Sequence, residues 1–318
     1  MSRRGVFNTG DGVAVRDLPA IEPGDGVRLR VTSVGICSTD LWVMAQGPSP
    51  FVVGHEFAGY LDDGTLVAAY PLMRCHACDQ CARGAFNRCR RVFEGSLGLG
   101  AHGGMCDELL VAPDSVVVLP EGLRPGDAGL VEPFAVAIHA LERIGTHPGR
   151  RVAVVGGGAV GLTLAAVARA GGHDVAVVAR HRHQVAAAER LGLTVTVAGE
   201  YDVVVDAAGT ESGLDRAAGL LAPGATLLLL GIYPPAGISF PALTLMMKEA
   251  QVLTSTAYCF NSRRNDFAAA ASFLAANPAV IDAIVTHRYP LADAPAAFVS
   301  ARDRAGGTIK VVVDPTGG

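Results

Sequence analysis

Two patterns of apolar residues divide the chain. From the start to about Leu130, short apolar segments alternate with turns rich in Gly and Pro. Val27–Val31 alternates apolar and polar residues with period two, and Leu109–Val111 and Val116–Leu119 are further short apolar runs. Strands of this length between turns predict an antiparallel barrel or sandwich.

From about Phe134 onward, apolar runs alternate with Ala-rich segments. We predict strands at 151–155, 174–178, 201–206 and 225–230, with helices at 160–170, 183–191 and 213–221 between them. Strands alternating with helices indicate βαβ units and a parallel sheet. The strand expected at 308–313 returns to the earlier pattern. We therefore expect one domain from 1–133 and 278–318, and a second from 134–277.

Composition favours a compact enzyme. Half of the 318 residues are hydrophobic and 18% are charged, which is enough to bury two cores of ordinary size. The net charge of −4 gives no electrostatic basis for binding nucleic acid or an anionic membrane. No apolar run reaches the roughly eighteen residues of a membrane span, and no apolar signal segment follows the first residues. A cytoplasmic protein without nucleic-acid or membrane partners is expected.

A glycine-rich turn closes the first strand of the second domain. Gly156, Gly158 and Gly161 are spaced as G-x-G-x-x-G, and Val160 lies in the helix that follows. The first glycine suits a tight turn, the second lets the backbone approach a pyrophosphate, and the third lets helix and strand pack closely. We therefore predict a dinucleotide site; the alternative is a glycine-rich turn without a ligand.

Four of the seven cysteines lie within one short segment, at Cys75, Cys78, Cys81 and Cys89. Short loops with this spacing can surround a tetrahedral Zn²⁺ with four thiolates. Such a site has no open coordination position, so its role is expected to be structural. An iron–sulfur cluster and a zinc module that binds nucleic acid are the alternatives, and the net negative charge argues against the second.

A second group of possible ligands is spread along the chain: Cys37, His55, Glu56 and Glu132. Thiolate, imidazole and carboxylate together suit a zinc site that keeps a position for water or substrate. A single buried cysteine is more often a small hydrophobic residue. The prediction of a catalytic metal therefore rests on the whole set.

These segments resemble a known family. GICSTD (35–40), VVGHEFAG (52–59), VEPFAVAIHA (131–140) and VAVVGGGAVG (152–161) are similar to elements of the zinc-dependent medium-chain dehydrogenase/reductase (alcohol dehydrogenase) superfamily, nearest its sorbitol/threonine dehydrogenase branch. The order of elements agrees from about Val27 to Val313. The resemblance implies an α/β fold with a doubly wound Rossmann domain and a mostly-β GroES-like catalytic domain, in which 75–89 is the structural zinc lobe.

By this resemblance Cys37 and His55 bind the catalytic zinc, and Glu56 or Glu132 completes the site or exchanges at the metal. Asp40 would orient His55, as carboxylates behind zinc-bound histidines commonly do. Two zinc ions per chain are therefore expected.

The resemblance also assigns Thr39 to hydrogen-bond the substrate hydroxyl and begin a proton relay. Relatives often carry a histidine at the outer end of that relay, where this chain has Trp42, so the proton would leave by cofactor ribose and water. Zinc would act as a Lewis acid on the alcohol, and hydride would pass to the nicotinamide. The stretch between Glu56 and Cys75 is shorter than usual, which predicts a trimmed cleft.

The cofactor is expected to be NADP(H) in preference to NAD(H). Dinucleotide-binding units that use NAD carry an acid about twenty residues beyond the glycine turn, where this chain has Ala179. Arg180, and also Arg182, offers a guanidinium suited to a 2′-phosphate. An exposed basic loop without this role is the alternative.

The sequence thus predicts a zinc-dependent oxidoreductase that transfers hydride between a secondary alcohol or polyol, or the matching ketone, and NADP(H). The relatives imply a homodimer or homotetramer. The alternatives are an NAD-dependent polyol or threonine-type dehydrogenase, a zinc-free quinone or enoyl reductase, and a non-enzymatic zinc- and nucleotide-binding sensor. The substrate itself is not encoded in any motif. Phe93, Phe134 and Tyr258 are candidates for a substrate pocket or for core packing.

Overall fold

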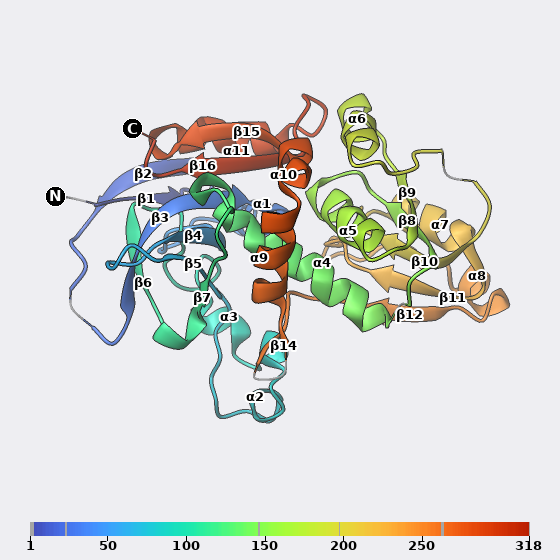
Figure 1. Ribbon diagram of the computed structural model, residues 1–318, viewed down its shortest axis with the longest axis horizontal. Helices are drawn as coiled ribbons and strands as arrows, with labels where there is room; N and C mark the ends of the chain where they lie inside the picture. The colour runs from blue at the N-terminus through green and yellow to red at the C-terminus, as the bar shows by residue number, and fades with distance from the viewer. Residues whose placement is uncertain (1–2, 23, 146, 197, 262–263, 318) are drawn as a thin grey trace. The chain divides into compact units, whose positions relative to one another are not determined.

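The computed structural model describes residues 3–22, 24–145, 147–196, 198–261 and 264–317 (Figure 1). The chain forms two compact units. Unit 1 comprises Met1–Ala135, Cys259–Ile281 and Val285–Gly318, and unit 2 comprises Val136–Tyr258 and Asp282–Ile284. Helices α4 (Val131–Ile144) and α10 (Pro278–Ile284) each contribute residues to both units.

Unit 1 is built around a seven-stranded sheet of order β15-β16-β3-β4-β5-β7, with β6 also paired to β3. All of its pairings are antiparallel except that of β15 with β16. Its strands are β3 (Val27–Ile36), β4 (Glu56–Tyr60), β5 (Leu66–Ala69), β6 (Glu108–Val111), β7 (Val116–Val118), β15 (Val285–Pro290) and β16 (Lys310–Asp314). The mostly antiparallel domain predicted from the period-two pattern is confirmed.

Two hairpins and several short helices complete unit 1. Helix α11 (Ala294–Arg302) packs on β2 (Val13–Leu18), β15 and β16. Its Phe298 is buried in the core that Leu29 and Phe57 of the sheet also form. The further elements are β1 (Arg3–Asn8), β2 (Val13–Leu18), α1 (Ser38–Met44), α2 (Asp79–Ala82), η1 (Phe86–Arg88), α3 (Val92–Gly95), η2 (Pro113–Ser115), η3 (Pro125–Leu130), β13 (Phe260–Asn261), β14 (Arg264–Asn265), α9 (Asp266–Ala276), η4 (Leu291–Asp293) and α11 (Ala294–Arg302).

Unit 2 holds a five-stranded, wholly parallel sheet of order β12-β11-β10-β8-β9. Its strands are β8 (Arg151–Val155), β9 (Asp174–Val178), β10 (Tyr201–Asp206), β11 (Leu221–Leu229) and β12 (Gln251–Thr254), and its helices are α5 (Ala159–Ala170), α6 (Arg182–Arg190), α7 (Glu211–Leu220) and α8 (Ala242–Met247). These parallel pairings confirm the predicted parallel sheet. Three of its strands, β8, β9 and β10, also have the predicted bounds. Strand β11 begins earlier than predicted.

The segment from Cys259 to Ile281 packs with unit 1, whereas the sequence pattern placed the second domain up to residue 277. Phe267 of α9 lies against Tyr70 with ring centroids 5.7 Å apart, and Phe273 stacks on Phe134 at 5.5 Å. Helix α9 is Ala-rich like the helices of unit 2. Composition alone therefore does not show to which core it belongs.

Among the residues that the structure describes, no single helix is long and apolar enough to cross a membrane. Helices α9 and α10 meet the length and composition requirement only as a pair, which is bent by 92° at its break.

Candidate active site and metal centres

Among the residues of unit 1 that the structure describes, Cys37, His55 and Glu56 form one of two groups of potential metal ligands. Their donor atoms all lie within 4.8 Å of one another. Cys37 follows the end of β3 and caps α1, and Glu56 is the first residue of β4. Strands β3 and β4 pair antiparallel, with Gly35 opposite Glu56. The pairing of two neighbouring strands therefore brings these distant residues together.

Asp40 forms hydrogen bonds with two residues of this group. Its Oδ1 lies 3.0 Å from Nδ1 of His55, and its Oδ2 accepts the backbone N–H of Cys37 at 2.8 Å. Burial alone would lower the pKa of His55, but the Asp40 carboxylate and Cys37 outweigh it and raise that pKa well above 6.5. Because Asp40 occupies Nδ1, the other ring nitrogen of His55 is left for a metal.

Thr39 lies beside the same group. Its Oγ1 is 3.5 Å from Sγ of Cys37, and the residue is half-buried. Trp42, one turn further along α1, is 41% exposed. A hydroxyl that can both donate and accept a hydrogen bond is thus placed at the edge of the ligand group.

Glu132 stands apart from the other three residues. It lies in the first turn of α4 and is buried, but it is not one of the residues whose donor atoms share the 4.8 Å group. Its charge is nevertheless close enough to contribute to the raised pKa of Lys310. In this arrangement Glu56, rather than Glu132, offers the nearer carboxylate.

Lys310 belongs to the site although the sequence analysis did not select it. It is the first residue of β16, is 3% exposed, and forms an ion pair with Glu56. Its Nζ also donates to the backbone oxygen of Ile36 at 3.0 Å. The only signal in the sequence is a charged residue at the start of a buried apolar run.

The second ligand group consists of the four clustered cysteines. Their sulfur atoms lie within 4.8 Å of one another, and those of Cys75 and Cys81 are 3.8 Å apart. Backbone N–H groups of Arg90 and Cys81 lower the pKa of Cys78 to about 6, whereas burial raises the pKa of Cys81 to about 12. Four sulfurs gathered in one short lobe fit a closed tetrahedral zinc site.

In unit 2 the glycine turn has the geometry of a dinucleotide-binding loop. Gly156 has φ +118°, and a Cβ on Gly161 would lie 1.9 Å from the oxygen of Gly156. Gly158 caps the N-terminus of α5, whose second residue is Val160. A Cβ built on Gly158 would have no other atom within 4 Å. The positive φ of Gly156 and the close approach at Gly161 require glycine for the fold. The open space at Gly158 instead leaves room for a ligand at the helix N-terminus.

The loop after β9 lies against this turn. A Cβ on Gly157 would be 2.9 Å from that of Ala179. The backbone N–H groups of Arg180 and His181 donate to Oε1 of the buried Gln184 at 3.2 and 3.3 Å, while the Arg180 side chain is exposed. The loop backbone is thus fixed and Arg180 remains accessible.

A buried carboxyl group at the end of β10 was also missed by the sequence analysis. Oδ2 of Asp206 accepts a hydrogen bond from the Tyr233 hydroxyl at 2.6 Å, and Oδ1 accepts the N–H of Ala208 at 2.9 Å. Burial raises the pKa of Asp206. The carboxyl ends of parallel strands are where dinucleotides bind in such folds.

The three aromatic candidates have different surroundings. Phe134 and Tyr258 are buried, and Phe134 stacks on Phe273, so both serve core packing. Phe93 is 73% exposed.

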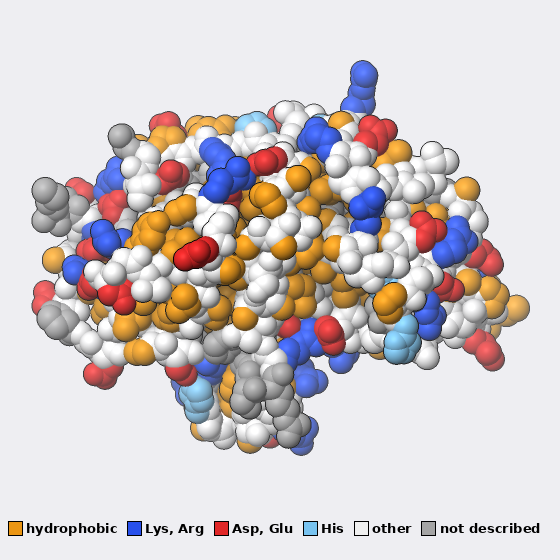
Figure 2. Space-filling view, viewed as in Figure 1, with side chains coloured by type: hydrophobic (Ala, Val, Ile, Leu, Met, Phe, Trp, Pro, Cys, Tyr) orange, Lys and Arg blue, Asp and Glu red, His pale blue; other side chains and the backbone are white. Residues whose placement is uncertain are grey.

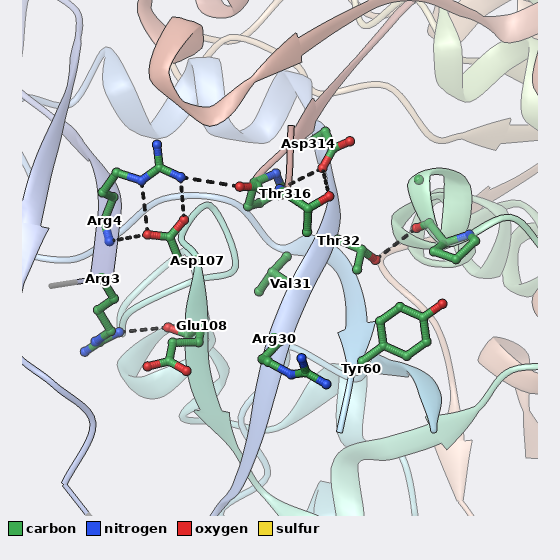
Figure 3. A pocket seen from close by; sticks show the side chains of 13 residues that line it. Arg3, Arg4, Arg30, Val31, Thr32, Tyr60, Asp107, Glu108, Asp314 and Thr316 are labelled. Carbon is green, nitrogen blue, oxygen red and sulfur yellow. Dashed lines mark hydrogen bonds and ion pairs between the residues drawn. The ribbon is translucent and has the colours of Figure 1, made fainter. Parts of the chain in front are cut away.

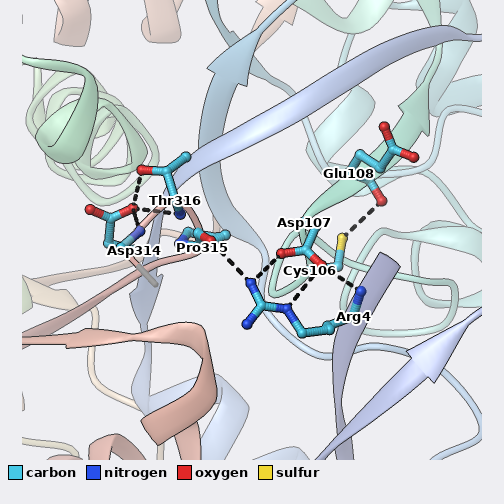
Figure 4. Close-up of polar contacts among 8 residues, drawn as sticks. Arg4, Cys106, Asp107, Glu108, Asp314, Pro315 and Thr316 are labelled. Carbon is cyan, nitrogen blue, oxygen red and sulfur yellow. Dashed lines mark hydrogen bonds and ion pairs between the residues drawn. The ribbon is translucent and has the colours of Figure 1, made fainter. Parts of the chain in front are cut away.

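A separate hollow of about 650 Å³ lies on unit 1 and is lined in part by Arg3, Arg4, Arg30, Tyr60, Asp107 and Asp314 (Figure 3). Arg4 pairs with Asp107 at 2.8 Å and also donates to the Pro315 oxygen at 3.4 Å, while Sγ of Cys106 donates to the Glu108 oxygen at 3.2 Å (Figure 4). These contacts tie β1 to the segment before β6 and to the C-terminal residues. No residue of either ligand group lines the hollow, so we regard its polar groups as structural.

Basic and acidic side chains are interspersed on the face shown in Figure 2. This mixture agrees with the small net charge of −4.

The comparisons with known proteins agree with this geometry. Residues 23–121 match the alcohol dehydrogenase GroES-like domain, and residues 159–276 match the zinc-binding dehydrogenase domain. L-galactonate-5-dehydrogenase of Escherichia coli (strain K12) is 32% identical over 310 residues, which cover 87% of this chain and 88% of that protein. Sorbitol dehydrogenase of Rattus norvegicus is 27% identical over 334 residues, covering 94% and 91% of the two chains.

Among solved structures, a zinc-binding dehydrogenase from Sinorhizobium meliloti 1021 bound to NADP superposes with a TM-score of 0.89. It is 27% identical, and the match covers 99% of this chain and 100% of that one. The chain therefore belongs to the zinc-dependent medium-chain alcohol dehydrogenase family, in its sorbitol dehydrogenase branch. It is an oxidoreductase, and the predicted family and the Rossmann and GroES-like fold are confirmed.

Proposed function

We propose that this enzyme transfers hydride between a secondary alcohol or polyol, or the matching ketone, and NADP(H). The observation that carries the proposal is the grouping of Cys37, His55 and Glu56, with Thr39 beside them and Asp40 behind. Polyol and sugar-acid dehydrogenases among the relatives support the substrate class.

The residues present fit the two zinc ions that we propose. Sulfur, nitrogen and oxygen donors within 4.8 Å of one another form a mixed set that zinc accepts while keeping room for another ligand. In that site Cys37 and His55 would hold the metal, with Glu56 or Glu132 as the third protein ligand. The four-cysteine group would hold the second zinc, with a structural role.

The chain's own residues then have distinct tasks. A zinc bound by Cys37 and His55 would supply Lewis acidity, which favours removal of a proton from an alcohol. The Thr39 hydroxyl accepts the substrate's hydrogen bond and takes up its proton. The Trp42 indole cannot accept that proton. A bound cofactor's ribose and water would therefore be the route by which the proton leaves Thr39. Asp40 keeps His55 in the orientation and tautomer that a metal ligand needs.

We propose that unit 2 binds the cofactor through its glycine turn and selects NADP(H). Gly156, Gly158 and Gly161 allow a pyrophosphate to approach the N-terminus of α5, which begins directly before Val160. Ala179 leaves no carboxylate to repel a 2′-phosphate, and the exposed Arg180 offers it a planar donor. The relative from Sinorhizobium meliloti that is bound to NADP supports this choice. NAD(H) is the alternative.

The test of this function is an activity panel. The zinc-loaded chain would be assayed with polyols, sugar acids, amino alcohols and simple alcohols, each with NADP and NAD. We expect formation of reduced cofactor with a polyol or sugar acid, faster with NADP. Absence of turnover with every alcohol, at full zinc content, would contradict the proposal and favour the zinc- and nucleotide-binding sensor.

We further propose that the protein is a homodimer or homotetramer of the cytoplasm. In the part of the chain that the structure describes, strand β12 pairs with β11 alone and forms an edge of its sheet, and its Val252 is exposed. Leu243, Met246 and Met247 of α8 are between 66% and 73% exposed. Apolar surface of this kind commonly marks an interface. Cys37, Cys106 and the four clustered cysteines form no disulfide bonds, which suits a reducing compartment. Light scattering that gave a monomer mass would contradict the oligomer.

A further inference from the structure

The ion pair between Lys310 and Glu56 lies inside the protein, next to the proposed zinc ligands. Glu56 is 1% exposed and Lys310 is 3% exposed. A buried ammonium without a partner is very costly, so the pair with Glu56 and the bond to the Ile36 oxygen keep Lys310 charged.

The sheet brings the two charges together across its middle strand. Strand β3 lies between β16 and β4, with Gly35 opposite Glu56 on one side and Val312 on the other. A Cβ on Gly35 would lie 1.9 Å from Oε2 of Glu56 and 2.9 Å from Cε of Lys310. The pair therefore meets in the space that the missing side chain of Gly35 leaves free.

The Glu56 carboxylate is consequently shared between two sets of neighbours. Its neighbours are the donor atoms of Cys37 and His55, within 4.8 Å, and the ammonium of Lys310, with which it forms an ion pair. A carboxylate engaged by a buried cation is a weaker metal ligand than a free one, because the two cations compete for the same oxygens.

We propose that Lys310 is a positioning residue that competes with the catalytic zinc for Glu56. By holding the carboxylate, Lys310 keeps a coordination position open for the alcohol. When Glu56 is released from Lys310, it closes that position. This inference rests on the proposed function of the Cys37–His55 site as a zinc centre.

The test is the rate at which the chain loses its catalytic zinc to a chelator. Lys310→Met removes the charge but keeps the length, so Glu56 would remain on the metal and zinc release would slow by about tenfold or more. Substitution of cobalt for zinc gives a second readout, because the visible absorption of the metal would shift when Glu56 becomes a constant ligand. We expect kcat to fall at the same time.

A double-mutant cycle separates this mechanism from a general charge effect. In a Glu56→Gln background, Lys310→Met should change the rate of zinc release by no more than about twofold. If the full slowing persisted in that background, Lys310 would act on the metal directly and the inference would be wrong. Lys310→Gln, which can still donate to the Ile36 oxygen, provides the same comparison should Lys310→Met fail to fold.

Cys37→Ser distinguishes failure of the inference from failure of the proposed function. If the parent holds a zinc that Cys37→Ser loses, but Lys310→Met releases it at the parent rate, only the inference is overturned. If the parent holds no zinc that depends on Cys37, the proposed function fails as well.

Discussion

Asp40 and His55 are joined at 3.0 Å by a carboxylate oxygen and ring Nδ1. The other oxygen of Asp40 accepts the backbone N–H of Cys37 at 2.8 Å. One buried side chain thus fixes two of the proposed zinc ligands, one by its ring and the other by its backbone.

Asp40→Asn should weaken the catalytic zinc site. An amide is uncharged and supports a zinc-bound imidazole less well, so we expect zinc affinity to fall by about 10–100-fold. Zinc per chain after dialysis against a graded series of chelator concentrations measures this. Asp62→Asn, at an exposed carboxyl group, is the matched control. Equal retention of zinc by Asp40→Asn and the control would show that Asp40 does not support the metal.

Cys89→Ser should remove the structural zinc alone. A site whose four thiolates hold one metal loses affinity and folding free energy together when one thiolate is removed. We expect one zinc fewer per chain and a lower Tm, with the Cys37-dependent zinc initially retained. Cys106→Ala is the control, because Cys106 is also buried but lies outside both ligand groups. Full zinc content and an unchanged Tm in Cys89→Ser would disprove the assignment.

Thr39→Val should lower turnover without loss of metal. The valine keeps the shape of the side chain but cannot accept the substrate's proton, a role worth on the order of 10²–10⁴ in rate. Measurement of kcat and zinc content together makes the test, with the exposed Thr316→Val as control. Turnover within about threefold of the parent would remove Thr39 from the relay.

Ala179→Asp should shift cofactor preference toward NAD. A carboxylate at this position would accept the ribose hydroxyls and repel a 2′-phosphate. The ratio of kcat/KM for NADP to that for NAD is expected to exceed one in the parent and to fall in the variant. Arg180→Ala should also lower it, whereas Arg150→Ala, at another exposed arginine of unit 2, should not. A parent that prefers NAD would contradict the assignment.

Asp206 should make stability depend on pH in an identifiable direction. Because burial raises its pKa in the folded chain, the folded state keeps a proton that the unfolded state has already released. The stability that the protonated Asp206 carboxyl group contributes to the folded state is therefore present at low pH. It is lost as the pH rises through the raised pKa of the folded state. The Tm of Asp206→Asn relative to that of the parent should therefore increase as the pH rises from below the ordinary range of an Asp carboxyl group to well above it. The exposed Asp215→Asn should show no such trend, and a difference that fell with pH would contradict the sign.

The fold could be predicted closely wherever local pattern decides structure. Apolar runs near glycine-containing turns specify β8, β9 and β10, because a buried parallel strand is nearly continuously hydrophobic and turn residues mark where it stops. Helix α9 could not be placed in this way. Its contacts through Phe267 and Phe273 are with residues far away in the sequence, and its alanines fit either core.

The same reasoning applies to the candidate site. Cys37, His55 and Glu56 could be found because their motifs are local, and the structure brings them together. Lys310 could not, because its partner Glu56 is reached only through the pairing of β16 with β3 and of β3 with β4. Motifs alone therefore do not reveal a residue whose role depends on the order of strands in a sheet.

The central claim is that a zinc bound by Cys37 and His55 supports alcohol oxidation, and one paired measurement tests it most directly. Zinc per chain and polyol-dependent formation of reduced cofactor would be determined on the same preparations of the parent and of Cys37→Ser. The account predicts two zinc ions and turnover for the parent, and one zinc ion without turnover for the variant. A Cys37→Ser protein that kept both zinc ions and turned over at the parent rate would contradict it.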